Sequence, residues 1–243
     1  EISAQSIGTQ NRWSINDNGS ISWQTGSNIP HEDHIEMSGE KISAIISYGV
    51  NQDEQFTIER TFVWPMLRHL PHKTRNHLKR TSDWNILNSV YINNIPISEL
   101  EKVTEVNLNG LMTVKSTLKN DMELIRTLFP STKLPVYFEK YLLKNTSGKT
   151  VFIEIPEYKN TFYTDASIGV YGKYTVSYES AGSGGFTLAP GESVALAALF
   201  KATKEGETFE IDLQKEENQR KALVEQWRHN LVLETPDEVL NTA

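Results

Sequence analysis

Short stretches in which apolar and polar residues alternate are the feature that most constrains the fold of this chain. Trp13-Ser14-Ile15 and Ile21-Ser22-Trp23 flank residues 16–20, whose Asn, Asp and Gly tolerate positive φ. Because side chains alternate between the two faces of a strand, this pattern predicts a hairpin with Trp and Ile on one face. Similar patterns predict strands at residues 42–48, 56–62, 111–118, 122–129, 136–143, 150–155, 170–178, 193–201 and 208–213.

The number of alternating stretches predicts a mostly β fold. We expect a large antiparallel β-sandwich (a supersandwich) over residues 1–213, and about fifteen strands would exceed a simple immunoglobulin-type sandwich. Two stretches lack the alternation. Residues 65–84 are rich in Arg, Lys and His and are expected to form a long excursion. Residues 181–185, Ala-Gly-Ser-Gly-Gly, are expected to form a flexible loop.

The C-terminal part changes to a helical period. Residues 215–230 contain many helix formers, and Leu223, Trp227 and Leu231 recur at i, i+4 and i+8. A helix this short is marginal alone in water, so it has to dock on another element. We expect docking on the sandwich through Leu223 and Trp227.

A second helix start follows. Thr235 fits an N-cap, Pro236 the first helical position and Glu238 the third. Residues 214–243 are therefore predicted to be a helical linker, whose last ten residues make few tertiary contacts because the helix that begins there lacks its packing partner.

Composition argues against several classes of function. The chain has 243 residues and a formal net charge of -7, whereas a nucleic-acid or anionic-membrane surface requires a basic field. It has no cysteine, which excludes disulfides, thiol catalysis and thiolate metal sites. The longest apolar run, residues 194–200, is too short to span a bilayer. The first residue is Glu1 rather than Met, as expected for a processed or shortened chain.

Four segments in a fixed order carry a resemblance to a known family. They are Met-Glu-Leu-Ile-Arg-Thr-Leu-Phe-Pro-Ser (122–131), Leu-Lys-Asn-Thr-Ser-Gly-Lys (143–149), Leu-Ala-Pro-Gly-Glu-Ser (188–193) and Leu-Glu-Thr-Pro-Asp-Glu-Val-Leu-Asn (233–241). With the helical linker, this order resembles the N-terminal β-supersandwich domain of glycosidases with an (α/α)6 barrel, the six-hairpin glycosidases, in particular the glycogen-debranching-like group and its relatives. The last segment resembles the start of the first barrel helix.

The resemblance implies a non-catalytic N-terminal domain of a glycoside hydrolase that acts on oligo- or polysaccharide. In the similar enzymes the acid and base come from barrel loops, so this chain alone is expected to be inactive, with no catalytic residue and no cofactor. Its partners would be carbohydrate and the enzyme's own C-terminal helical barrel, in a periplasmic or extracellular location. The alternative is a free-standing carbohydrate-binding β-sandwich module.

The densest polar stretch is residues 31–36, His-Glu-Asp-His-Ile-Glu, which follow Pro30. On a helix, His31 and His34 would share a face, and the neighbouring carboxylates could complete a zinc or iron site. On a strand, positions i and i+3 point to opposite faces, and the inward phase of Ile35 and Met37 favours a strand. We therefore expect a polar segment at the sandwich edge, a loop running into a strand, that binds no metal.

A third interpretation keeps part of this stretch functional without a metal. Loops at one end of a supersandwich can reach the substrate cleft of the barrel, where polar side chains would bind sugar hydroxyls. Tryptophans are further candidates: three are expected to pack in the core (Trp13, Trp23, Trp227), whereas two flank the basic excursion. The candidate substrate contacts are therefore His31, Asp33, His34, Glu36, Trp64 and Trp84.

Overall fold

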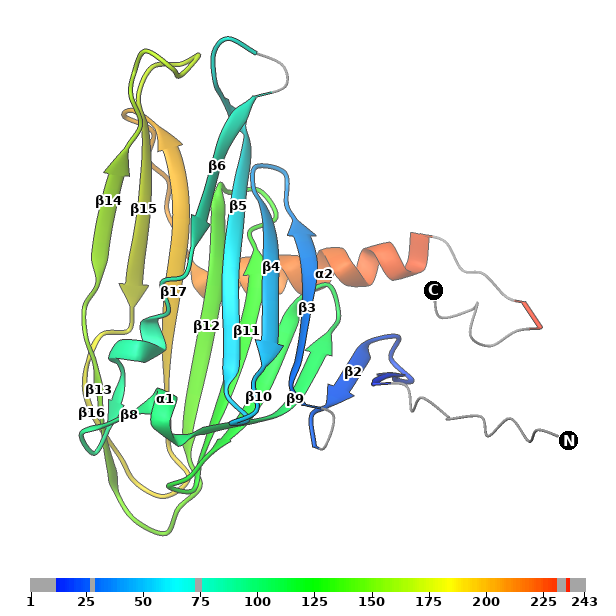
Figure 1. Ribbon diagram of the computed structural model, residues 1–243, viewed down its shortest axis with the longest axis vertical. Coiled ribbons are helices and arrows are strands. Elements are labelled where there is room, and N and C mark those ends of the chain that lie inside the picture. The colour runs from blue at the N-terminus through cyan, green and yellow to red at the C-terminus, as the bar shows by residue number, and fades with distance from the viewer. Residues whose placement is uncertain (1–11, 27–28, 73–75, 231–234, 237–243) are drawn as a thin grey trace, which may run out of the picture.

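The computed structural model describes residues 12–26, 29–72, 76–230 and 235–236. These residues form seventeen strands in three antiparallel sheets, with one long helix at the C-terminal end (Figure 1). The prediction of a mostly β chain with a large antiparallel sandwich and a C-terminal helix is confirmed.

Nine strands form the largest sheet. In spatial order they are β1 (Trp13–Ile15), β2 (Ile21–Gln24), β9 (Glu101–Leu108), β10 (Met112–Leu118), β11 (Met122–Pro130), β12 (Val136–Asn145), β17 (Ser193–Lys204), β15 (Tyr174–Ala181) and β14 (Lys159–Tyr163). Tight turns connect neighbours that are consecutive in sequence, as at Asp121, whose φ of 57° lies in the left-handed region. The predicted N-terminal hairpin pairs Trp13 with Trp23 and Ile15 with Ile21.

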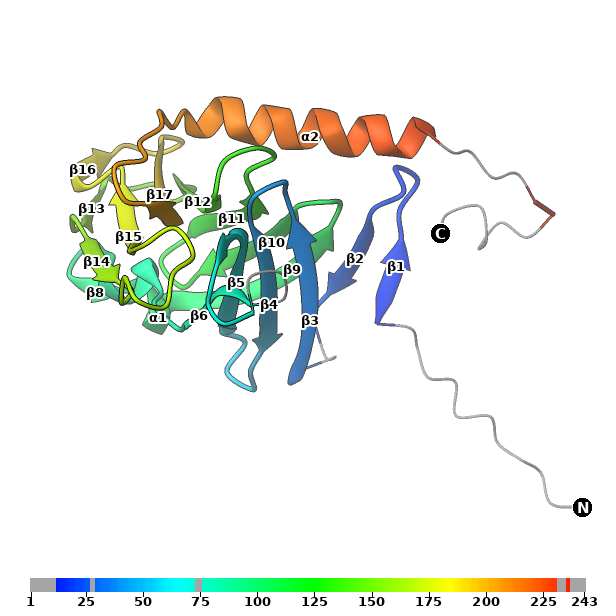
Figure 2. The same cartoon turned by 90° about the horizontal axis from the view of Figure 1, so that it is seen from above.

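Two smaller sheets complete the β structure. One contains β3 (His31–Ser38), β4 (Ser43–Val50), β5 (Phe56–Arg68) and β6 (His77–Ser82); the other contains β16 (Gly184–Leu188), β13 (Val151–Ile155), β7 (Tyr91–Ile92) and β8 (Ile95–Pro96). The helices are η1 (Ile86–Ser89), α1 (Ile97–Leu100) and α2 (Leu213–Asn230). Figure 2 shows the nine-stranded sheet between α2 and the sheet of β3 to β6.

The main core lies between the two facing sheets. Phe62, Tyr137 and Phe200 are fully buried there, with ring centroids 4.7 Å apart for Phe62 and Phe200 and 5.3 Å apart for Phe62 and Tyr137. Burying a phenylalanine side chain such as that of Phe62 or Phe200 stabilises the fold by about 1.5–3 kcal/mol relative to exposure to water. The alternation of apolar residues in the sequence predicts this core because inward residues recur at every second position.

The prediction that residues 65–84 form an excursion is wrong for residues 65–68 and 77–82, which belong to strands. β5 continues to Arg68 and β6 begins at His77, so the segment is mainly a long hairpin. Trp64 belongs to β5 and has 0% exposure, with its Nε1 donating to the carbonyl of Pro135 at 3.0 Å. The alternation of apolar and polar residues could not be recognised in the sequence, because the many basic side chains of this hairpin lie on its polar outer face.

Two buried ion pairs cross the β structure. Arg60 on β5 donates to both carboxylate oxygens of Glu139 on β12, at 2.6 and 2.7 Å, and thereby connects the two facing sheets. Glu139 also accepts a hydrogen bond from Tyr141 Oη at 2.6 Å. Arg126 and Glu101 form a similar pair within the nine-stranded sheet. Burial lowers the pKa of Arg60, but the Glu139 carboxylate raises that pKa overall, so Arg60 stays charged.

Other sequence predictions need correction. The flexible loop expected at residues 181–185 is reduced to Gly182 and Ser183, since β15 ends at Ala181 and β16 begins at Gly184; Gly182 has a φ of 81°. The strand predicted at residues 208–213 does not form, since residues 208–212 have no regular secondary structure and Leu213 begins α2. Their apolar side chains instead pack on the outer face of the large sheet. The strand predicted at 170–178 begins only at Tyr174, and β9 and β14 were not predicted.

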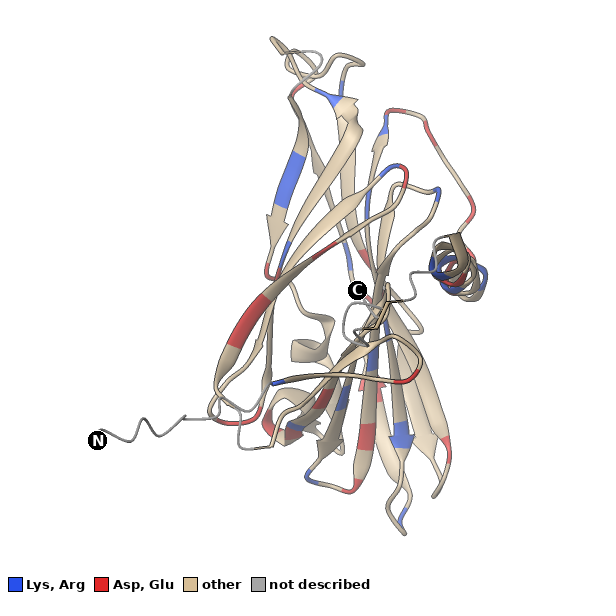
Figure 3. Cartoon of the chain, turned by 90° about the vertical axis from the view of Figure 1, so that its right-hand side faces the viewer, with Lys and Arg blue, Asp and Glu red and all other residues tan. Residues whose placement is uncertain are grey.

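Helix α2 lies on the outer face of the nine-stranded sheet, where Figure 3 shows it along its axis. Polar contacts anchor it: Arg220 donates to the carbonyls of Gly110 and Ser38 at 3.0 and 2.7 Å, and Glu217 binds Lys140 at 2.6 Å. Val224 packs directly against Gly110. None of the helices in the described ranges is long and apolar enough to cross a membrane.

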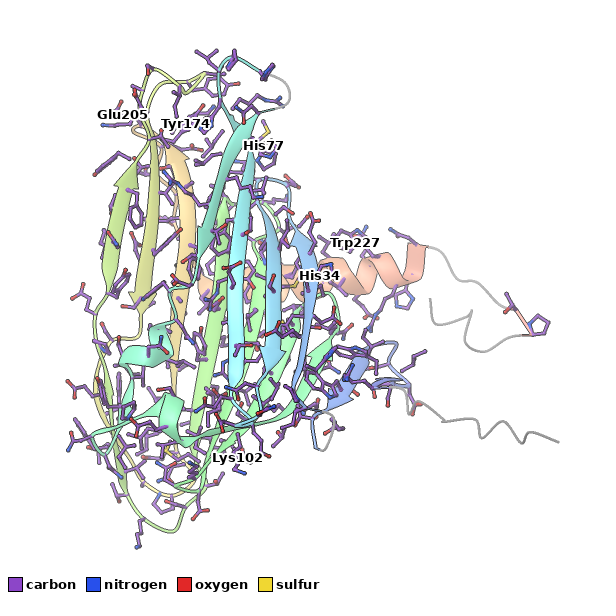
Figure 4. The ribbon with its side chains drawn as sticks, viewed as in Figure 1. His34, His77, Lys102, Tyr174, Glu205 and Trp227 are labelled. Atoms are coloured by element: carbon purple, nitrogen blue, oxygen red, sulfur yellow. The ribbon has the colours of Figure 1, made fainter. Side chains whose placement is uncertain are left out.

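The predicted docking face of α2 is therefore wrong in one residue. Trp227, labelled in Figure 4, is 51% exposed. Leu223 is half-buried. The buried positions are Glu216, Glu217 and Arg220, which apolar periodicity does not identify. Leu231 and the predicted second helix lie outside the described residues, apart from Thr235 and Pro236.

The anchoring of α2 is expected to weaken in acid. Burial raises the pKa of Glu217, but hydrogen bonds from Lys140 and Lys221 outweigh burial and lower it overall. The stability that the Glu217 carboxylate adds to the folded state is therefore fully present above the unfolded-state pKa of about 4.3. It is lost as the pH falls through the lowered folded-state pKa of Glu217. In urea denaturation at several pH values, Glu217→Gln should cost most at neutral pH and progressively less in acid. Glu210→Gln, at an exposed position just before α2, is the control; a pH-independent cost of Glu217→Gln would contradict this account.

Candidate functional site

The polar stretch at residues 31–38 is a strand, β3, at the edge of its sheet. Met37 is buried, which confirms its predicted inward position. The loop expected at the start of this stretch is absent, because β3 already begins at His31. His31 shares the inner face with Met37 and lies edge-on to Trp23, with ring centroids 5.2 Å apart. His34 pairs with Ser47 and is largely exposed on the other face.

The carboxylate of Asp33 lies near both histidines, 3.8 Å from His31 Nε2 and 3.9 Å from His34 Nδ1. His31 and His34 lie on opposite faces of β3, so Asp33 contacts each of them weakly but does not bring the two imidazoles together around one ion. Within the described ranges, no group of three or more His, Asp or Glu side chains could hold a metal. Figure 4 shows that His34 on β3 and His77 on β6 lie far apart along the sheet.

The outer face of this sheet carries a shallow hollow of about 540 Å³, lined by Glu32, Asp33, His34, Ser47, Tyr48, Thr57, Ile58 and Glu59. Its one aromatic residue, Tyr48, is 3% exposed, so the hollow offers no ring for stacking. Glu36 accepts a hydrogen bond from Ser43 at 2.6 Å farther along the same strand. The hollow therefore provides hydrogen-bonding groups but no apolar platform.

Trp84 lies in a different environment from Trp64. Its ring stacks on Tyr158 with centroids 4.3 Å apart and an interplanar angle of 18°, and it is nearly parallel to Tyr178 at 6.2 Å. Its carbonyl accepts a hydrogen bond from Arg60 Nη1 at 2.9 Å. The ring is only partly buried, so part of it faces solvent.

Tyr158 is positioned by the end of β15. Its backbone N–H donates to Ser180 Oγ at 2.7 Å, and its carbonyl accepts from the Ser180 N–H at 2.8 Å. These bonds fix the short connection between β13 and β14, which follow one another along one edge of the molecule (Figure 1). The Trp84–Tyr158 stack is thus held from both sides by the backbone.

A cavity of about 250 Å³ opens beside this stack. It is lined by Trp84, Ile86, Ser89, Tyr91, Glu154, Pro156, Glu157 and Tyr158. Tyr91 is 37% exposed, and both glutamates are exposed. Small-molecule pockets typically have volumes of about 300–1,000 Å³. This cavity is slightly smaller and therefore suits a ligand of a single ring. We call it the Trp84 cavity.

The Trp84 cavity combines two kinds of groups that suit a sugar. Aromatic faces pack against apolar C–H surfaces, while ionised carboxylates accept hydrogen bonds from hydroxyl groups. Of the candidates predicted from sequence, only Trp84 lines this cavity; His31, Asp33, His34 and Glu36 lie on β3, and Trp64 is in the core.

Sequence reasoning missed most of the cavity. Tyr91, Glu154, Glu157 and Tyr158 gave no signal by themselves, although Glu-Ile-Pro-Glu-Tyr at 154–158 places acids and a tyrosine around a proline at a strand end. What joins this segment to Trp84 is tertiary contact, which sequence spacing does not show.

Comparison with known proteins adds no assignment. No protein-family model matches the chain, and no curated protein sequence matches it with statistical significance.

Zinc is not expected to bind β3. Because His31 and His34 occupy opposite faces of β3, an ion shared by both imidazoles would require the strand to distort. About a tenfold molar excess of Zn²⁺ should leave the melting temperature unchanged, since ligands that bind only the folded state raise it. A rise that disappears in His31→Ala but persists in His77→Ala would contradict this prediction.

Proposed function

We propose that this chain is a non-catalytic β-sandwich domain of a glycoside hydrolase and that it binds carbohydrate at the Trp84 cavity. The observation that carries the proposal is the partly exposed Trp84–Tyr158 stack beside the carboxylates of Glu154 and Glu157. The exposed ring of Tyr91 and the rim of the stack would contact the apolar face of a pyranose ring, and the carboxylates would accept bonds from its hydroxyls.

The buried carboxylates of the described residues have structural roles. Each buried glutamate within the described ranges already has a partner: Glu101 binds Arg126, Glu139 binds Arg60, Glu216 accepts from Ser131 Oγ, and Glu217 binds Lys140. Glycoside hydrolysis requires two carboxyl groups that flank the substrate, roughly 5–10 Å apart. These glutamates are instead used to hold strands and α2 together.

The placement of α2 supports a role as a platform for a second domain. The resemblance to six-hairpin glycosidases implies a helical barrel after the linker. α2 is fixed to the large sheet through Arg220 and Glu217 while Trp227 stays exposed. Such a rigid, partly apolar helix would support the barrel and orient the sandwich against it.

A free-standing carbohydrate-binding module is the second candidate function. The Trp84 cavity supports this candidate as much as it supports a domain of a glycoside hydrolase. The coding sequence after Ala243 separates the two. Amphipathic helical hairpins over several hundred residues would support the enzyme domain, whereas a stop codon at that point would support the free module.

Tyr91→Ala tests carbohydrate binding. Tyr91 lines the cavity and is 37% exposed, so truncation should remove sugar contact with little effect on the core. Isothermal titration with neutral malto-, cello-, xylo- and manno-oligosaccharides should show binding of at least one series, and Tyr91→Ala should weaken it about threefold to tenfold.

Tyr171→Ala is the control for this experiment. Tyr171 is exposed, lies outside the Trp84 cavity and has Lys204 over its ring, so its loss should leave the affinity unchanged. Equal weakening by both variants, or no binding of any saccharide, would contradict the proposed site. Release of reducing sugar by the chain alone would contradict its non-catalytic role.

A further inference from the structure

Aromatic side chains continue from the Trp84 cavity along β14. Trp84 is nearly parallel to Tyr178, and Phe162 on β14 meets Tyr178 edge-on with centroids 5.4 Å apart. Tyr178 is buried beneath these rings, whereas Phe162 is 40% exposed. The series Tyr158, Trp84, Tyr178 and Phe162 therefore forms an aromatic strip whose two ends reach the surface.

Strand geometry gives the strip its direction. Tyr158, Asn160 and Phe162 are at alternate positions and so share a face, and at about 3.3 Å per residue Tyr158 and Phe162 are about 13 Å apart along the strand. This length exceeds a single sugar ring. Asn160 lies between them, half-buried, and its Nδ2 donates to Tyr158 Oη at 3.4 Å.

The facing sheet ends at the strip, where Ser82 on β6 is hydrogen-bonded to the Tyr178 side chain. β14 is the edge strand of the nine-stranded sheet, and β6 is the edge strand of the facing sheet. Figures 1 and 2 both show β14 beyond β6, with no strand in front of it. The 40% exposure of Phe162 and the partial exposure of Asn160 show that this end of the inner face of β14 reaches solvent.

The opposite face of β14 differs in its chemistry. It borders a hollow of about 390 Å³ in which the charges are paired with one another: Glu179 lies 2.8 Å from Lys201 and 3.5 Å from Lys159. The exposed ring of Tyr163 has Lys173 over it at 5.1 Å. This face offers no continuous strip of rings and serves as the internal comparison.

From this strip we infer that the saccharide bound by this chain is a neutral oligosaccharide of several units, which lies along the inner face of β14 from the Trp84 cavity to Phe162. This inference rests on the proposed function and specifies its ligand. The rings at the two ends of the strip, Tyr158 and Phe162, would contact separate sugar units, with Asn160 supplying hydrogen bonds between them. Neutral sugars are favoured because Glu154 and Glu157 would repel an acidic chain.

Adjacent residues on opposite faces of β14 allow a matched test. Phe162→Ala removes the far end of the strip, while Tyr163→Ala removes an exposed ring from the other face. Isothermal titration would use malto-, cello-, xylo- and manno-oligosaccharides from the monosaccharide to the hexasaccharide. The wild-type affinity should rise with chain length in the series that binds, and Tyr163→Ala should behave like the wild type.

Phe162→Ala should bind the monosaccharide normally but the hexasaccharide about threefold to tenfold more weakly. Phe162→Leu, which keeps apolar volume but loses the ring, should reproduce this loss even if the alanine variant is unstable. A length-independent affinity that still depends on Tyr91 would overturn the inference while leaving the proposed function intact. Weakening by Tyr163→Ala alone would place the ligand on the other face and also overturn it. Absence of saccharide binding would overturn both.

Discussion

The bidentate bond between Arg60 and Glu139 is the interaction on which most of this structure depends. It joins β5 of the smaller sheet to β12 at the centre of the larger one, and both side chains are buried. Removing two charges from water costs several kcal/mol per ion, so the pair is stable only with good geometry and further hydrogen bonds. Tyr141 supplies one such bond to Glu139, and the ring of Phe200 lies 5.5 Å from the guanidinium.

The same arginine connects the core to the surface. Arg60 Nη1 donates to the carbonyl of Trp84, which fixes the chain just after β6. Tyr158 is held from the other side by Ser180. The Trp84–Tyr158 stack is thus preorganised by the sandwich, and a ligand that stacks there would not bear the entropic cost of ordering the rings.

Sequence alone predicted the fold class because inward residues such as Phe62 and Met37 follow the strand period. It failed where polar contacts decide the packing. Trp227 belongs to the apolar stripe of α2 but is exposed, because Glu217 and Arg220 bond to the sheet instead. Trp64 and Trp84 looked equivalent from sequence, yet one is in the core and one lines a cavity.

A double-mutant cycle of unfolding free energies tests the central claim that Arg60 and Glu139 hold the two sheets together as a pair. Arg60→Leu and Glu139→Leu, each measured by chemical denaturation, are expected to cost about 3–5 kcal/mol because each leaves an unpaired buried charge. The double variant should cost clearly less than the sum of the two, since it leaves neither charge behind. Additive costs would show that the two residues act independently and would contradict the account.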